Sequence, residues 1–71
     1  MPNPAKDIAT INGNHIIQVQ INTIVGKRVI AESFTDAKNP SIKVNALPAG
    51  VYVVTITTTD KKTQTIQLLK K

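Results

Sequence analysis

Side chains branched at the β-carbon dominate this sequence. Ten Ile, seven Val and nine Thr make up 26 of the 71 residues, against three Leu and six Ala. Branching at the β-carbon restricts the first side-chain torsion and suits extended strands better than helices. The composition therefore predicts an all-β fold and excludes a helical bundle.

Apolar and polar residues alternate with a period of two in several short segments, which indicates strands with one buried face. In the segment 15–22, Ile17, Val19 and Ile21 alternate with polar side chains. We expect strands at 8–11, 15–22, 28–34, 41–45, 51–58 and 62–69. We expect a type I′ hairpin turn at Asn12-Gly13, a tight turn at 24–27, a polar loop at 36–40, a break at 47–50 and a turn at 59–61.

Six or seven short strands joined by brief turns predict an antiparallel β-sandwich of immunoglobulin-like type, smaller than usual. A small barrel such as an OB-fold is the competing architecture. The length allows one domain, which buries only about 60% of its unfolded surface and is marginally stable alone. Since cysteine is absent, no disulfide stabilises it.

The sequence does not contain a recognisable catalytic pattern. Nucleophilic catalysis needs a nucleophile, a base within reach and an orienting group. No candidate lies in an activating context, and one His with four scattered acidic residues does not predict a metal site. We therefore expect neither an enzyme nor a cofactor. The candidates considered are Ser33, Ser41, His15, Asp7, Asp36 and Asp60.

The formal net charge of +5 raises the question of an acidic partner. Proteins that bind single-stranded nucleic acid combine basic grooves with aromatic side chains that stack on the bases. Only Phe34 and Tyr52 are aromatic, and Tyr52 is expected in the core with its hydroxyl bonded at the rim. Spread-out lysines commonly protect sheet edges, so we expect no nucleic-acid partner. No apolar run approaches the roughly 20 residues of a membrane span, and no amino-terminal signal is recognisable.

Two segments are less easily explained by local structure alone. Pro2-Asn3-Pro4, followed by Asp7, forms a stiff entry in which Asp7 is able to bond nearby amides. Gly50 lies in a Leu-Pro-Ala-Gly-Val-Tyr-Val-Val block, where it supplies a turn geometry closed to other residues. Each segment alone has an ordinary structural explanation, but their order along the chain indicates how the domain is related to known domains.

In this order, the segments resemble the type A carboxy-terminal sorting domain of the type IX secretion system of Bacteroidota. Such domains typically open with Tyr-Pro-Asn-Pro, continue with a Gly-Lys-x-Val turn and a Leu-x-x-Gly-x-Tyr segment, and close with a basic strand. Met1 stands where an aromatic is frequent, and Gln67 stands near a frequent lysine. The matching blocks are 2–7, 21–29, 47–56 and 65–71.

The resemblance implies that residues 1–71 form one sorting domain, with 1–7 as the entry from an upstream passenger to which it is covalently linked. It implies a non-catalytic signal that directs the passenger through the outer-membrane translocon. A β-barrel shuttle protein would then receive it, and a cysteine-protease sortase would usually remove the domain. The implied route runs through the periplasm to the cell surface or the medium, where the sortase joins the passenger to an anionic lipopolysaccharide.

The resemblance also implies a set of recognition residues. We expect an edge strand and its backbone groups to be read, mainly on the hairpin of 51–56 and 64–71, and weak self-association through exposed edges. The alternative is an extracellular module, appended to a secreted enzyme, that binds carbohydrate or protein. The expected recognition residues are Pro2, Asn3, Pro4, Asp7, Gly26, Leu47, Gly50, Tyr52, Lys70 and Lys71.

Overall fold

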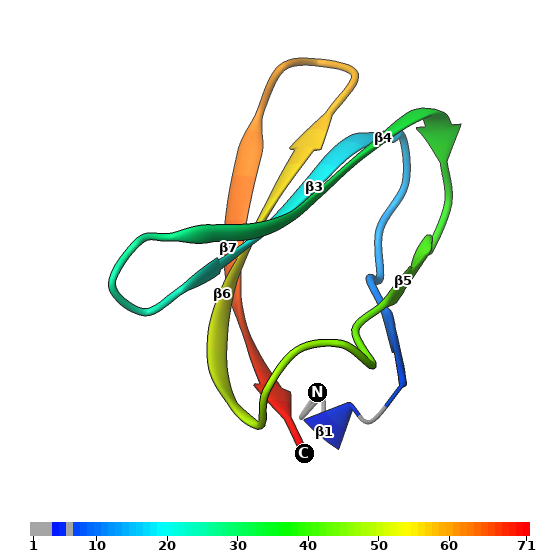
Figure 1. The fold of residues 1–71 in the computed structure, drawn as a ribbon. Helices are drawn as coiled ribbons and strands as arrows, with labels where there is room; N and C mark the ends of the chain where they lie inside the picture. Colours follow the sequence, from blue (N-terminus) through cyan, green and yellow to red (C-terminus); the bar gives the residue numbers. More distant parts are fainter. Residues whose placement is uncertain (1–3, 6) are drawn as a thin grey trace.

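The structure is a computed structural model that describes residues 4–5 and 7–71 of the chain. The described residues form seven strands in two sheets (Figure 1), and six of these strands have three residues or more. The strands are β1 (Pro4–Ala5), β2 (Ile8–Thr10), β3 (Ile16–Thr23), β4 (Arg28–Ala37), β5 (Ser41–Lys43), β6 (Gly50–Thr58) and β7 (Thr63–Lys70).

The larger sheet contains five strands in the order β1-β7-β6-β3-β4. The neighbours from β7 to β4 are antiparallel, whereas β1 runs parallel to β7. The entry segment expected to be only a stiff lead-in thus contributes a strand at Pro4–Ala5. A proline is tolerated there because an edge strand does not need every amide as a donor.

The smaller sheet pairs β2 with β5, and it faces the larger one across the core (Figure 1). Core residues come from both sheets, so the domain is a two-layer sandwich, which confirms the all-β, immunoglobulin-like prediction over the barrel. The buried apolar residues are Ala9, Ile11, Ile16, Val19, Ile21, Ile42, Val44, Tyr52, Val54, Ile56 and Leu68.

The predicted hairpin at Asn12-Gly13 is wrong. β2 pairs with β5 rather than with β3, so the chain crosses from one sheet to the other here. Gly13 accepts a hydrogen bond from the amide of Asn39 (2.8 Å) and donates its own to the Asn39 side chain (2.8 Å). Burial of Ile11 and Ile16 on either side outweighs the local turn preference.

The alternation predicted for β3 is also shifted at its start. The register of β3 against β6 moves between Ile16 and Gln18, which leaves Ile17 as the extra residue of a β-bulge. As a result Ile16 is buried and Ile17 is only half-buried, whereas Val19 and Ile21 face the core as predicted.

The turns at 24–27 and 59–61 are confirmed. In the first, the amide of Gly26 donates to the carbonyl of Thr23 (2.9 Å), and φ at Gly26 is +92°. In the second, Lys61 takes the corresponding position with φ of +65°. The predicted loop at 36–40 is shorter than expected, because β4 continues to Ala37.

Candidate recognition surface

Three of the sequence-predicted residues meet at one end of the larger sheet, although they lie far apart in the sequence. Gly50 is the register partner of Lys70, and Pro4 is the partner of Leu69 on the other side of β7. Both ends of the described chain lie at this end of the sandwich (Figure 1). The fold therefore brings the first, third and last blocks of the sequence pattern together.

Tyr52 anchors the connection that leads into β6. Its side chain is buried, and its hydroxyl donates a hydrogen bond to the carbonyl oxygen of Pro48 (2.6 Å). Leu47 lies half-buried against the same core. This arrangement, a buried tyrosine bonded to backbone a few residues upstream, is used by immunoglobulin-like sandwiches to fix a corner. The predicted role of Tyr52 as a core residue bonded at the rim is confirmed.

Gly50 has a backbone conformation that side chains disfavour. Its φ is +152°, at the first residue of β6. A β-carbon built at Gly50 would meet no heavy atom within 4 Å, so the requirement for glycine comes from the backbone and not from crowding. Gly50 therefore has a conformational role at this corner.

The two lysines that follow Leu69 differ in environment. Lys70 lies on the core-facing side of β7 and is 8% exposed, and its ammonium group donates to the carbonyl oxygen of Lys71 (2.9 Å). Lys71 is exposed. A long lysine side chain buries its methylene groups while keeping the charged group at the rim, so Lys70 combines packing with charge.

The remaining predicted residues that the structure describes lie away from Pro4, Gly50 and Lys70. The carbonyl oxygen of Asp7 accepts from the amide of Val44 (2.8 Å), which ties the entry to the smaller sheet. Gly26 lies in the turn between β3 and β4, which projects from the side of the sheet (Figure 1). Pro2 and Asn3 lie outside the described residues.

Two of the candidates for catalysis, His15 and Asp36, are in contact at the surface. His15 Nδ1 lies 3.0 Å from Asp36 Oδ1, but the two side chains are 68% and 55% exposed. The hydroxyl of Ser41 lies 3.4 Å from that of Thr10, between β5 and β2. An exposed pair of this kind is weakly held, and no side-chain hydrogen bond among the described residues joins a hydroxyl group to His15.

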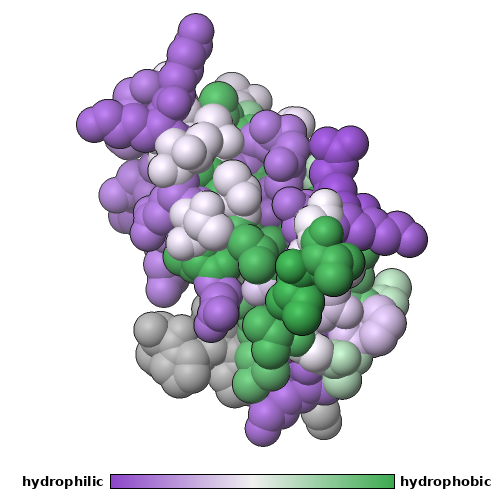
Figure 2. All heavy atoms as spheres, turned by 90° about the vertical axis from the view of Figure 1, so that its left-hand side faces the viewer, coloured by the Kyte–Doolittle hydropathy of each residue, from purple (hydrophilic) through white to green (hydrophobic). Residues whose placement is uncertain are grey.

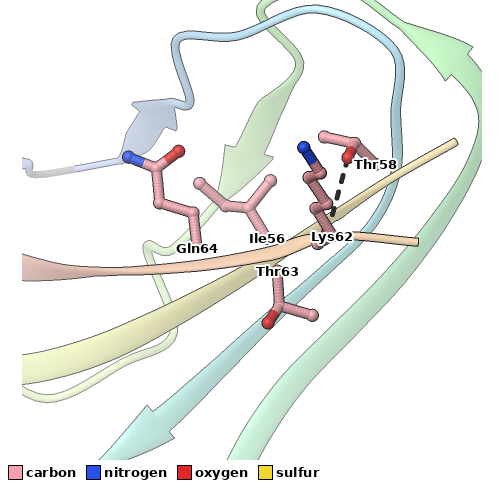
Figure 3. Close-up of a pocket in the computed structure, with 5 residues that line it drawn as sticks. All are labelled: Ile56, Thr58, Lys62, Thr63 and Gln64. Carbon is pink, nitrogen blue, oxygen red and sulfur yellow. Dashed lines mark hydrogen bonds between the residues drawn. The ribbon is translucent and has the colours of Figure 1, made fainter. Parts of the chain in front are cut away.

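A shallow hollow of about 370 Å³ lies where β6 ends and β7 begins (Figure 3). The side chains of Ile56, Lys62 and Gln64 point to one side of this hairpin, and Thr63 points to the other. The hydroxyl oxygen of Thr58 lies 3.4 Å from the carbonyl oxygen of Lys62, and its hydrogen is donated to the nearer carboxylate of Asp60. This lining offers one cation and neutral hydrogen-bonding groups, without a paired acid and base.

The part of the chain that the structure describes contains no group of three or more His, Cys, Asp or Glu residues placed to hold a metal ion. Within that same part, no helix is long and apolar enough to cross a membrane. The chain has one Tyr and one Phe. Tyr52 is buried and Phe34 is half-buried against the core, which gives no support to a carbohydrate module with an exposed aromatic platform.

The sequence analysis did not single out two exposed aliphatic side chains in the turn between β3 and β4. Ile24 is 72% exposed and Val25 is 86% exposed, both in the β3–β4 turn. Turns usually carry Gly, Pro, Asn, Asp or Ser. Two adjacent large aliphatic residues before Gly26 are therefore unusual, and the sequence alone could have indicated an exposed apolar site at this turn.

The comparisons with known proteins agree with the sequence pattern. The family model described as the secretion system C-terminal sorting domain matches residues 1–71, the whole chain. No curated protein and no solved structure matched the chain.

Proposed function

Because the chain belongs to the family of type IX secretion C-terminal sorting domains, we propose that it directs a covalently linked upstream passenger through the outer-membrane translocon. A β-barrel shuttle protein receives the domain, and a cysteine-protease sortase then separates it from the passenger, which stays attached to the cell surface. The route runs through the periplasm. The observation that carries this proposal is the family match over the full length of the chain.

The β6–β7 hairpin is the proposed docking element. Among the described residues, β7 is covered along its outer edge only by the two residues of β1, next to Leu69 and Lys70. The backbone groups of β7 from 63 to 68 therefore lack a strand neighbour on that side within the described chain. A free edge is the feature that lets a partner strand add to a sheet through main-chain hydrogen bonds.

The two lysines supply charge next to this edge. Lys71 is exposed and presents a full positive charge, whereas Lys70 presents only its end at the rim. We therefore expect Lys71 to act mainly through attraction to an acidic partner, and Lys70 through both packing and charge.

The entry segment, residues 1–7, is the proposed connection to the passenger. The chain joins the folded sandwich at Pro4–Ala5, which pairs with β7, and the backbone bond between Asp7 and Val44 then ties it to the smaller sheet. A sortase needs an accessible chain, so the cut is expected upstream of this point. A stiff Pro-Asn-Pro stretch would keep the cut site apart from the fold.

A reporter fusion tests this function. A fluorescent protein with a periplasmic signal is fused ahead of residues 1–71 and expressed in a bacterium that has the type IX route. We expect reporter at the cell surface or in the medium, separated from the domain, and retention in the periplasm when the translocon is deleted. Periplasmic retention of the intact fusion in the competent strain, with the domain folded, would contradict the proposal.

Two variants separate the roles of the lysines. In Lys71→Gln only the exposed charge is lost, and in Lys70→Met the packing is kept while the charge is lost. We expect both to fold with nearly unchanged thermal midpoints and to lower export. Export equal to that of the parent fusion in both variants would rule out a role for these charges in recognition.

A further inference from the structure

The outer face of the larger sheet carries an exposed apolar patch at the end where β3 turns into β4. Val51 of β6 is 44% exposed and Leu69 of β7 is 45% exposed, and the two are register partners. The last register pair between β3 and β6 is Thr23 with Tyr52, and Ile24 and Val51 are the residues next to this pair along the chain. We define the outer apolar patch as Ile24, Val25, Val51 and Leu69.

Strand alternation places this patch on the solvent side. Tyr52 and Leu68 face the core, so Val51 and Leu69 face outward. Figure 2 views the molecule from the side on which the β3–β4 turn projects, and hydrophobic residues form a continuous band across the lower half of this face. Exposed apolar groups that adjoin one another, instead of lying singly, mark interaction sites.

The turn holds its apolar side chains in a defined position. The amide of Thr23 donates to the carbonyl of Lys27 (2.8 Å), and the amide of Gly26 donates to the carbonyl of Thr23 (2.9 Å). The amide of Lys27 also donates to the hydroxyl of Thr23 (3.1 Å). Three hydrogen bonds across the turn reduce the conformational freedom that binding would otherwise remove.

The charges around the patch are positive. Lys27 and Arg28 directly follow the turn and are exposed. Glu32 pairs with Val19 in the middle of β3, and Asp36 and Asp60 lie near the opposite end of β3, since Ile16 pairs with Ala37 and Thr58 there. With about 3.3 Å per strand residue, that end is roughly 20 Å away. The patch is therefore an apolar centre with two cations on one side. Residues 22–29, which form the turn and its flanks, contain no Asp or Glu.

We propose that the outer apolar patch docks onto a protein of the export machinery whose surface offers an apolar depression bordered by carboxylates. This proposal rests on the sorting function proposed above and adds a second contact to the β7 edge. An apolar centre free of charge with a polar rim is the usual anatomy of a protein interface, and the exposed Gln67 contributes to that rim beside Val53.

Other occupants fit these observations less well. A second copy of this chain would bring Lys27 and Arg28 of both copies together, and each copy carries a net charge of +5. A lipid surface does not need a preorganised turn. The patch also has about as much aliphatic carbon as one myristoyl chain, which alone gives only marginal membrane binding.

Export of the reporter fusion is the test. The double variant Ile24→Ser/Val25→Ser removes the apolar tip, and Lys27→Glu/Arg28→Glu reverses the adjacent charge. The matched control is Ile8→Ser, which removes an aliphatic side chain that is 56% exposed on β2 of the other sheet. We expect both double variants to lower the exported fraction by about tenfold or more, as loss of a central interface residue typically does. The control exports normally.

The outcomes separate this proposal from the proposed function. A parent fusion that is not exported contradicts the sorting function. A parent that is exported, together with both double variants exported equally well, contradicts only the docking patch. Thermal unfolding of the purified chains guards against a folding defect, and the charge-reversed variant stays informative if the serine variant unfolds.

A direct contact measurement completes the test. A photo-crosslinking amino acid replaces Val25 in the fusion, and the product is compared with that from the same amino acid at Ile8. A cross-link from position 25, and not from position 8, to a translocon or shuttle protein supports the proposal. A lipid adduct, flotation of the purified chain with phosphatidylethanolamine–phosphatidylglycerol vesicles that depends on Val25, or a homodimer adduct would overturn it.

Discussion

Replacing Gly50 tests the corner at the start of β6, because the expected loss of folding stability comes from one backbone torsion. At φ of +152°, an L-residue with a side chain is strained, and such conformations cost of the order of 1–3 kcal/mol. A side chain also lowers the conformational entropy of the unfolded chain, which stabilises the folded state by about 0.4–1 kcal/mol. We therefore expect Gly50→Ala to lower the free energy of unfolding by roughly 1–2 kcal/mol.

The corresponding shift in Tm follows from the size of the domain. Unfolding entropy is about 2.1 cal/mol/K per residue, which gives roughly 150 cal/mol/K for the 71 residues. A loss of about 1–2 kcal/mol then lowers Tm by roughly 7–13 °C. Circular dichroism of the purified chain during heating measures this shift.

A second substitution separates backbone strain from crowding. No heavy atom lies within 4 Å of a β-carbon at Gly50, so Gly50→Val is expected to cost within about 1 kcal/mol of Gly50→Ala. The control is Ala49→Val, which adds the same side chain at an exposed neighbour without a positive φ and should change stability by no more than about 0.5 kcal/mol. An unchanged Tm for both Gly50 variants would refute the strain argument, and a far larger loss for Val alone would indicate crowding instead.

Three further predictions concern the core and the β6–β7 turn. Tyr52→Phe loses the hydrogen bond to the Pro48 carbonyl and is expected to cost about 1 kcal/mol in urea unfolding, and an equal urea midpoint would mean that the bond adds nothing. Val54→Ala, at a position with 0% exposure, is expected to cost about 2 kcal/mol from lost burial and the cavity left behind, and a loss under roughly 0.5 kcal/mol would contradict the burial of Val54 in the core. The hydrogen bond from the Thr58 hydroxyl is the main cause that lowers the pKa of Asp60 below its ordinary 3.8. Asp60→Asn should therefore be less stable than the parent at neutral pH, and this difference should shrink as the pH falls below 3.8 through the lower pKa of the folded state; a difference that stays constant with pH would refute the assignment.

Local patterns determined much of this fold. Alternation placed Val19, Ile21 and Val54 in the core, and the turns around Gly26 and at 59–61 follow from short-range chemistry. Each of these features depends on residues a few positions apart, which a period of two or a glycine reveals directly. The order of four short blocks along the chain also indicated the family that the full-length match shows.

Tertiary structure decided which segments became neighbours. The Asn12-Gly13 pair has the composition of a hairpin, yet burial of Ile11 in the core carries the chain across to the other sheet. The bulge at Ile17 is likewise visible only once β3 lies against β6. Such choices depend on the summed burial of distant side chains, which no local pattern encodes. For the same reason, the sequence pattern named the residues that meet beside β7, but only the folded sheet paired Val51 with Leu69 and placed the turn that carries Ile24 directly after the Thr23–Tyr52 pair.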